Sequence, residues 1–296
     1  MLASVKALLS SIVDYAGLFP PAKLGMGAAM ANYAQDQMTP YSWILGRFVV
    51  PASRLNELEE VLATFPIEEG KTRQWSLSVI VSSDVESDIE KVRSLHNKNQ
   101  IGISALEFPP LPPPEIERVF PRFPAGVDSF FEIPINKDLE AYLSVLQQSG
   151  ASAKVRTGGI TVDAFPSVSQ LCQCICAFAE ARVPFKATAG LHHPLPAKHR
   201  ITYEPDSPST VMHGFLNVAI AAAMLHWQKV TPEEALEVLE EPSVEGFQFK
   251  EESITWRDRQ LSIAQIEEAR QQFFRSFGSC SFQEPINDLK QLKLLS

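Results

Sequence analysis

The sequence is poor in cysteine, has no excess of basic residues and contains no apolar stretch long enough to cross a membrane. Four cysteines in 296 residues do not make a disulfide framework. Lysine and arginine number 26 against 35 aspartate and glutamate, so the formal net charge is −9. A general nucleic-acid binder would carry a basic footprint instead. The best apolar run, Phe215 to Leu225, falls short of the roughly 18 residues that a spanning helix requires. We therefore expect a soluble, cytoplasmic protein that binds neither nucleic acid nor membrane.

Three of the cysteines are closely spaced, at Cys172, Cys174 and Cys176. On a helix the first and third share a face and the second points away, so the three cannot close around one metal ion. We expect them to be small buried side chains.

Short apolar runs alternate with helical patterns along most of the chain. Seven runs have the character of strands: Ser11–Ala16, Trp43–Val50, Trp75–Ser82, Gly102–Phe108, Ser129–Ile135, Ala153–Gly158 and Pro184–Gly190. Their spacing is close to the length of one βαβ unit, which predicts a parallel sheet. The number of units favours an α/β fold of the (β/α)8 barrel type over a doubly wound open sheet.

The carboxyl-terminal third is less regular. We expect the eighth strand near Val244–Phe249, a small hairpin near residues 247–261, and a closing helix over Ile263–Phe277. The whole chain, residues 1–296, is then one barrel domain. Five prolines between Pro109 and Pro114 predict a stiff loop after the fourth strand.

Charged residues recur on strands that are otherwise apolar. A charge on the outer face would be buried under helices, so we expect these side chains at the inner mouth of the barrel. They are Asp14, Arg47, Glu107, Glu132, Lys154, Arg156 and Lys186. An ion-pair lattice without function is the alternative interpretation.

The cations of this set predict a small anionic ligand, a carboxylate or a phosphate. Arg47, Lys154 and Arg156 are the candidate anion-binding side chains, because an arginine fork can bind either group in bidentate fashion. Thr157, Gly158 and Gly159 are expected to offer backbone donors, and Thr188 shares a strand face with Lys186. Glu107 or Glu132 would move a proton.

Lys186 is a candidate catalytic residue. Inside a barrel and near other cations, its amine is expected to have a lowered pKa, which would allow attack on a carbonyl to form a Schiff base. Lys186 could instead pair with Glu132 or bind the substrate as a point charge.

Four histidines follow the seventh strand, at His192, His193, His199 and His213. His192 or His193, together with His213 and a carboxylate, could hold a divalent metal. Alternatively, a single histidine such as His192 serves as a general acid or base.

Three segments together resemble a family of bacterial (β/α)-barrel proteins of uncharacterised function: Lys154–Gly159, Phe185–Pro194 and Met212–Asn217. This resemblance covers most of the chain and implies no reaction. In addition, Lys186-Ala-Thr-Ala-Gly190 is similar to the Schiff-base strand of deoxyribose-phosphate aldolase. Lys154–Gly159 is similar to a second strand of that family, although the two occur here in reversed order. The aldolase resemblance implies that Lys186 is the nucleophile.

We therefore expect a barrel enzyme of lyase, aldolase or isomerase type that acts on a small anionic metabolite. A metal-dependent lyase or hydrolase that uses the histidines is one alternative. A barrel that binds a metabolite without catalysis is another. A homo-oligomer is possible in each case.

Overall fold

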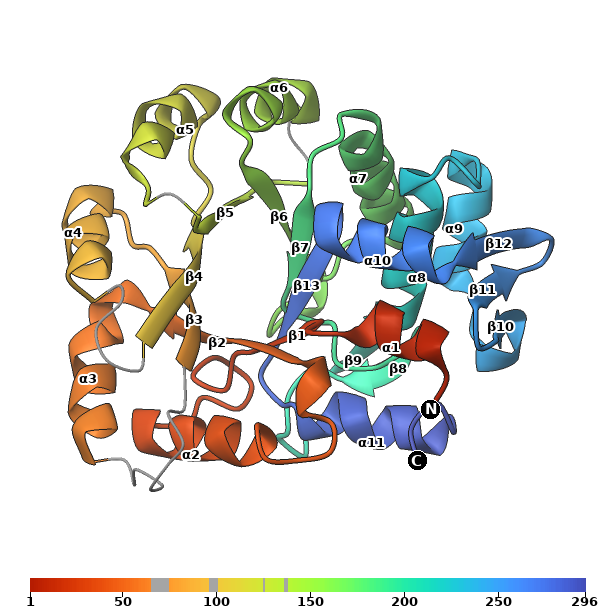
Figure 1. Ribbon diagram of the computed structural model, residues 1–296, viewed down its shortest axis with the longest axis horizontal. Coiled ribbons are helices and arrows are strands. Elements are labelled where there is room, and N and C mark those ends of the chain that lie inside the picture. Colours follow the sequence, from red (N-terminus) through yellow and green to blue (C-terminus); the bar gives the residue numbers. More distant parts are fainter. Residues whose placement is uncertain (65–74, 96–100, 125, 136–137) are drawn as a thin grey trace.

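The structure, a computed structural model, describes residues 1–64, 75–95, 101–124, 126–135 and 138–296. Eight strands close into a barrel in which all neighbours pair in parallel, and helices surround it (Figure 1). The predicted (β/α)8 barrel is confirmed.

The barrel strands, in their order around the sheet, are β1 (Val13–Tyr15), β13 (Phe274–Ser279), β7 (Phe185–Thr188), β6 (Ser152–Arg156), β5 (Asp128–Glu132), β4 (Ile101–Phe108), β3 (Trp75–Ile80) and β2 (Leu45–Pro51). The α-helices are α1 (Ala3–Leu9), α2 (Met26–Asp36), α3 (Leu55–Thr64), α4 (Val85–Leu95), α5 (Pro113–Val119), α6 (Leu139–Ser149), α7 (Val168–Glu180), α8 (Phe215–His226), α9 (Pro232–Glu240), α10 (Ile263–Gln272) and α11 (Gln283–Gln291). Short 3-10 helices lie at η1 (Ser42–Ile44), η2 (Ala52–Arg54), η3 (Phe120–Arg122), η4 (Val162–Ala164) and η5 (Val244–Gly246).

The eighth barrel strand is β13, so the expectation of Val244–Phe249 was wrong. β13 inserts between β1 and β7, pairing Val13 with Phe277 and Ala187 with the same residue from the other side. The predicted closing helix, Ile263–Phe277, is helical only to Gln272. Phe273, Phe274 and Phe277 have the spacing of a helix face, but they precede Gly278 and small serines that suit a strand packed inside a barrel.

The chain between β7 and β13 carries two small sheets. A hairpin of β8 (Ala197–Arg200) and β9 (Ser209–Met212) follows β7 directly. After α8 and α9 comes an antiparallel sheet of β10 (Phe247–Phe249), β11 (Ser253–Trp256) and β12 (Arg259–Ser262). The hairpin predicted near residues 247–261 lies in this sheet, and Phe249 ends its first strand rather than a barrel strand.

Local sequence signals explain where several helices begin. Ser167, Thr231 and Ser262 each form a capping box with a Gln or Glu three residues later, at the start of α7, α9 and α10. In α7, Cys172 and Cys174 are buried, and the sulfur atoms of Cys172 and Cys176 are 4.0 Å apart. The four cysteines are free, and the prediction of buried side chains is confirmed for Cys172 and Cys174, whereas Cys176 is only partly buried.

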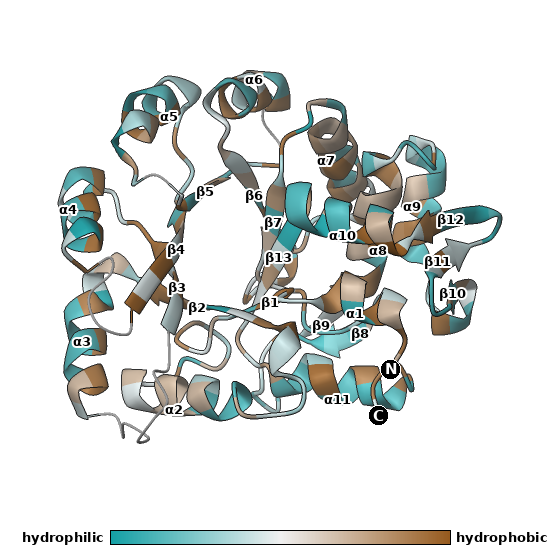
Figure 2. Cartoon of the chain, in the orientation of Figure 1, coloured by the Kyte–Doolittle hydropathy of each residue, from teal (hydrophilic) through white to brown (hydrophobic). Residues whose placement is uncertain are grey.

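The apolar core lies between the barrel and its helices. Most outer helices show both teal and brown surfaces in Figure 2, whereas α8 is mostly brown. Every residue of α8 from Phe215 to Leu225 is buried. Between β1, α2, β2 and β3, four aromatic rings pack in contact, those of Tyr15, Tyr33, Phe48 and Trp75. Among the helices in the described part of the chain, none is both long and apolar enough to cross a membrane.

Candidate functional site

A cavity of about 480 Å³ opens at the carboxyl end of the barrel. Its lining includes Ile80 at the end of β3, Pro109 after β4, Arg156 at the end of β6 and Thr188 at the end of β7. This volume is typical of small-molecule sites. Barrel enzymes carry their catalytic residues at this end of the strands, so we take this cavity as the candidate site.

The cavity has apolar walls and a charged floor. Phe19, Ile160 and Phe165 belong to the walls, and the β8–β9 region adds Ile201 and Met212. The charged lining residues come from β4 to β7: Glu107, Glu132, Lys154, Arg156 and Lys186. Apolar walls of this kind exclude water and strengthen the electrostatic interactions within the cavity.

The floor is a chain of alternating charges. Lys186 Nζ lies 2.6 Å from Glu107 Oε1. Lys154 Nζ lies 3.5 Å from Glu107 Oε2 and 3.3 Å from Glu132 Oε2. Arg156 Nε completes this half at 3.2 Å from Glu132 Oε1. The pairing register explains the contacts, because Glu132, Lys154 and Lys186 are aligned on three adjacent strands.

The same alternation continues toward the amino end of the barrel. Lys186 Nζ also lies 2.6 Å from Asp14 Oδ2, and Arg47 approaches the same oxygen at 3.9 Å. Arg47 and Arg275 then share Asp128 Oδ2, at 2.5 and 3.0 Å. We call the nine side chains from Arg156 to Arg275 the axial ion series. It begins and ends with an arginine, one at each opening of the barrel.

Arg47 therefore lies at the opposite end from the expected anion site. It is the third residue of β2, and it lines a second cavity at the amino end of the barrel. The charged strand residues thus form an ion-pair lattice, and five of its members also line the carboxyl-end cavity: Glu107, Glu132, Lys154, Arg156 and Lys186.

Ionisation is strongly coupled at the centre of the axial ion series. Burial alone would raise the pKa of Glu107, but the charges of Lys186 and Lys154 lower it to about 2. Asp14 has a lowered pKa as well: burial opposes the shift, and Lys186 and Arg47 outweigh it. Burial would lower the pKa of Lys186, yet attraction to Asp14 and Glu107 raises it above its ordinary value. The expectation of a lowered amine pKa at Lys186 was wrong, because sequence alone did not place two carboxylates beside it.

We expect Lys186 to resist trapping as a Schiff base, since an ammonium group has no lone pair to attack a carbonyl. The measurement is peptide mass spectrometry after incubation with small aldehydes and ketones and cyanoborohydride. The exposed Lys198 serves as the internal control for reagent activity. A stoichiometric adduct on Lys186 would contradict the ammonium assignment.

Acid is expected to destabilise the protein through Glu107. Its pKa of about 2 in the folded chain lies below the ordinary 4.5. The contribution of this carboxylate is therefore complete above about pH 4.5, and is lost as the pH falls toward 2 because the unfolded chain takes up the proton first. Urea unfolding at several acidic pH values gives the free energy of unfolding as a function of pH. In Glu107→Gln this free energy should change less steeply with pH than in the wild type, by up to about 1.4 kcal/mol per pH unit. Glu117→Gln, at an exposed position of α5, should keep the wild-type slope.

The Thr157-Gly158-Gly159 turn packs against the turn that follows β7, at Ala189 and Gly190. The hydroxyl of Thr157 donates to the backbone carbonyl of Ala189, and Thr157 is fully buried. A Cβ at Gly158 would lie 2.8 Å from the Cα of Gly190, so these two turns pack backbone against backbone. Gly159 and Thr188 line the cavity, whereas Thr157 supports it from outside. The backbone N–H of Thr157 donates to the carbonyl oxygen of Thr188 at 2.9 Å, and of the three residues predicted as backbone donors Gly159 alone is part of the cavity lining.

The histidines after β7 each have a protein partner. His192 Nδ1 lies 3.2 Å from Glu284 Oε2, and His193 Nδ1 lies 2.6 Å from Asp288 Oδ2. The His193 ring stacks on His199, with 3.4 Å between centroids. His213 is mostly buried, and its Nε2 lies 2.9 Å from the carbonyl oxygen of Pro166. Of the four, His192 lines the cavity.

The three histidines considered as metal ligands, His192, His193 and His213, are not brought together. Their ring nitrogens are directed at different partners, and the rings of His192 and His193 are 6.5 Å apart. In the part of the chain that the structure describes, no group of three or more His, Cys, Asp or Glu side chains is arranged to hold a metal ion. The donor set therefore does not fit the divalent metal that the sequence allowed.

The carboxylates of α11, Glu284 and Asp288, were not predicted from the sequence as part of the site. They follow β13, and recognising that strand would have placed the residues after it at the same mouth as His192. The pKa of Glu284 is lowered: burial opposes the shift, and the hydrogen bond and charge of His192 outweigh it. Because Glu284 is then a carboxylate, Nδ1 of His192 donates to it.

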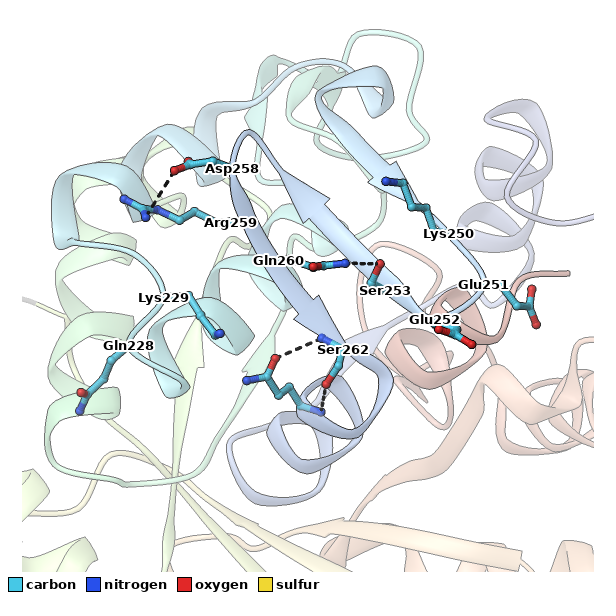
Figure 3. A pocket seen from close by; sticks show the side chains of 11 residues that line it. Gln228, Lys229, Lys250, Glu251, Glu252, Ser253, Asp258, Arg259, Gln260 and Ser262 are labelled. Atoms are coloured by element: carbon cyan, nitrogen blue, oxygen red, sulfur yellow. Dashed lines mark hydrogen bonds and ion pairs between the residues drawn. The ribbon is translucent and has the colours of Figure 1, made fainter.

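A larger hollow, of about 950 Å³, lies beside the three-stranded sheet of β10, β11 and β12 (Figure 3). Its side chains pair with one another: Gln260 donates to Ser253 at 2.9 Å, and Arg259 lies 3.6 Å from Asp258. Lys250 and Glu251 point away from each other around its rim in Figure 3. No set of charged groups converges in it among the described residues, so the barrel cavity remains the candidate site.

Comparison of the chain with known protein families, with curated proteins and with solved structures finds no match.

Proposed function

We propose that the protein is an enzyme of the lyase or isomerase type that acts on a small carboxylate or phosphate ester in the cavity at the carboxyl end of the barrel. The observation that carries this proposal is the end of the axial ion series at Arg156. Its side chain is 49% exposed and has Glu132 as its carboxylate partner, while Glu132 is shared with Lys154. A substrate anion can therefore bind the free edge of the Arg156 guanidinium.

The charge of the cavity supports an anionic substrate. Three cations, Lys154, Arg156 and Lys186, face two carboxylates, Glu107 and Glu132, in a chain whose formal net charge is −9. A cationic site in an acidic protein concentrates small anions locally. Thr188 and the Gly159 turn would add uncharged donors beside the arginine.

The proposed proton carrier is His192. Glu284 fixes its Nδ1, and its Nε2 has no partner among the described residues. An imidazole held in this way is a general base that becomes an acid after taking a proton, and Glu284 stabilises the charged form. Glu132 is a second candidate for proton transfer, because it lies on the cavity surface between two cations. Lys186 and Glu107, which lie deeper in the barrel, would contribute to the electrostatic potential at His192 and Glu132.

Proton exchange tests the proposal without knowledge of the substrate. Candidate hydroxy acids, keto acids and phosphate esters are incubated with the protein in D₂O, and loss of the C–H signal is followed by NMR. We expect exchange or turnover of at least one compound, with the rate reduced about 100-fold or more in His192→Gln. Arg156→Gln should weaken binding about tenfold, the usual cost of losing a charged hydrogen bond. Arg122→Gln, which changes an exposed ion pair with Glu86, is the matched control.

A binding protein without catalysis is the second candidate function. The observation in its favour is that Glu107, Glu132, Lys154 and Lys186 are all engaged in ion pairs within the protein. Binding that depends on Arg156, with neither exchange nor turnover across the panel, would favour this candidate over the enzyme.

A further inference from the structure

A second cavity, of about 560 Å³, opens at the amino end of the barrel. Its lining includes residues before a strand or at one of its first two positions, such as Ser11 before β1, Leu45 in β2, Ser76 in β3 and Arg275 in β13. It therefore lies at the opposite opening from the candidate active site. The buried centre of the axial ion series, Asp14, Lys186 and Glu107, separates the two.

Three guanidinium groups line this second cavity: Arg47, Arg270 and Arg275. Arg47 and Arg275 converge on a single oxygen, Asp128 Oδ2. The register of β13 on β7 shifts between Phe274 and Phe277, and Arg275 and the next residue, Ser276, both contact carboxylates of the axial ion series. The two arginines therefore share one close carboxylate oxygen, and the second carboxylate near Arg47, that of Asp14, lies farther away at 3.9 Å.

Of the three arginines, Arg270 has its positive charge least balanced by nearby carboxylates. It is 8% exposed, and its guanidinium donates to the backbone carbonyls of Phe274, Arg275 and Ser10. Its Nε has no hydrogen-bond partner among the described residues. Burial lowers the pKa of Arg270, as do the nearby charges of Arg275 and Arg47. A buried charge held only by neutral acceptors favours a nearby anion.

The acidic groups around the cavity do not balance these charges. Asp14 already pairs with Lys186, whose Nζ lies 2.6 Å from Asp14 Oδ2, and Arg47 lies 3.9 Å from the same oxygen. Asp128 is shared by two arginines, and Glu267 is an exposed residue of the lining. An incoming anion would meet Arg275, whose side chain is 27% exposed, and Arg47, at 17%.

We propose that the cavity at the amino end of the barrel is a second ligand site, which binds the phosphate group of a small molecule between Arg47, Arg270 and Arg275. A phosphate offers several oxygens to guanidinium forks and carries nearly two charges near neutral pH. Ser11 is among the lining residues, and its hydroxyl can donate to a remaining oxygen, whereas the hydroxyl of Ser76 is already within 2.9 Å of Ser104. The volume exceeds that of a phosphate ion, so the site has room for an attached organic group.

This site does not depend on the proposed function, because none of its three arginines lines the carboxyl-end cavity. Arg275 and Arg156 form a natural comparison: each ends the axial ion series, and each pairs with one carboxylate. A change at either residue leaves that carboxylate with another cation, Arg47 or Lys154 respectively.

The experiment is arginine footprinting with phenylglyoxal, read by peptide mass spectrometry with and without inorganic phosphate. We expect phosphate to slow modification of Arg275 about fivefold or more, and to do so equally in the Arg156→Gln protein. In parallel, calorimetry should show phosphate affinity at this site reduced about tenfold or more in Arg275→Gln, with Arg275→Lys intermediate because it keeps the charge without the fork.

Protection of Arg156 with an unchanged rate at Arg275 would overturn the proposal and place phosphate at the carboxyl end alone. Equal protection by chloride of the same ionic strength would also overturn it, because that result indicates screening rather than a site. If Arg275→Gln does not fold, the wild-type footprint and the Arg275→Lys affinity still decide the question.

Discussion

Replacing Lys186 by methionine is expected to lower the free energy of unfolding by about 3–5 kcal/mol, the cost of removing one partner from a buried ion pair. Lys186 is 1% exposed and lies 2.6 Å from both Asp14 and Glu107. Without it, two carboxylates face each other at the centre of the barrel with less compensating charge. Like charges in so confined a space repel strongly, so one carboxylate would be driven to take up a proton.

Urea unfolding at neutral pH measures this effect. The exposed Lys198→Met is the matched control and should change the free energy of unfolding by less than about 0.5 kcal/mol. The triple variant Asp14→Asn, Lys186→Met, Glu107→Gln should be more stable than Lys186→Met alone, because it removes the carboxylates together with their cation. If the single variant is as stable as the wild type, the three groups do not form the ion cluster described above.

Gly190→Ala is expected to destabilise the protein by about 2–5 kcal/mol. Gly190 has φ +77°, a conformation that costs an L-residue about 1–2 kcal/mol. A Cβ there would lie 2.8 Å from both the Cα of Gly158 and the carbonyl oxygen of Thr157. These are backbone atoms of a neighbouring strand end, so the turn itself has to shift, which adds about 1–3 kcal/mol.

Gly150→Ala separates the two causes. Gly150 ends α6 with φ +73°, and a Cβ there would meet nothing within 4 Å. We expect this variant to lose only about 1–2 kcal/mol, the conformational cost alone. Thermal or urea unfolding of both variants provides the comparison. Equal losses would mean that the close packing of Gly190 on Gly158 is not a constraint. Because Gly190 lines the cavity, its variant should also weaken ligand binding, whereas Gly150→Ala should not.

The regular alternation of strand and helix patterns was enough to predict the barrel, because seven of its strands are short apolar runs at regular spacing. The eighth was missed because three phenylalanines in and before β13 mimic a helix face. The insertion after β7, with its own two small sheets, also displaced β13 far along the chain. The charged strand residues were predicted at the inner mouth of the barrel, since a charge under the helices would have no partner. Five of the seven line the carboxyl-end cavity, whereas Asp14 and Arg47 line the cavity at the other end.

Sequence could not show which opening each charge faces. Arg47 was expected with Arg156, yet it lies near the start of β2 and Arg156 lies at the end of β6. In a tilted barrel, the level of a residue depends on where its strand begins and on the stagger between strands. Likewise, the raised pKa of Lys186 depends on Asp14, a residue 172 positions away in sequence.

The place of β13 in the sheet also has a consequence for biosynthesis. The strand synthesised last closes the gap between β1 and β7, so both of these keep an open edge until residues 274–279 have been made. An open edge can pair with another chain, which makes the unfinished protein prone to aggregation. Ser276, which donates to Asp14 at 2.7 Å, arrives with the same strand. A nascent chain of this protein therefore gains the hydrogen bond from Ser276 to Asp14 only when β13 docks, after the other seven barrel strands have been made.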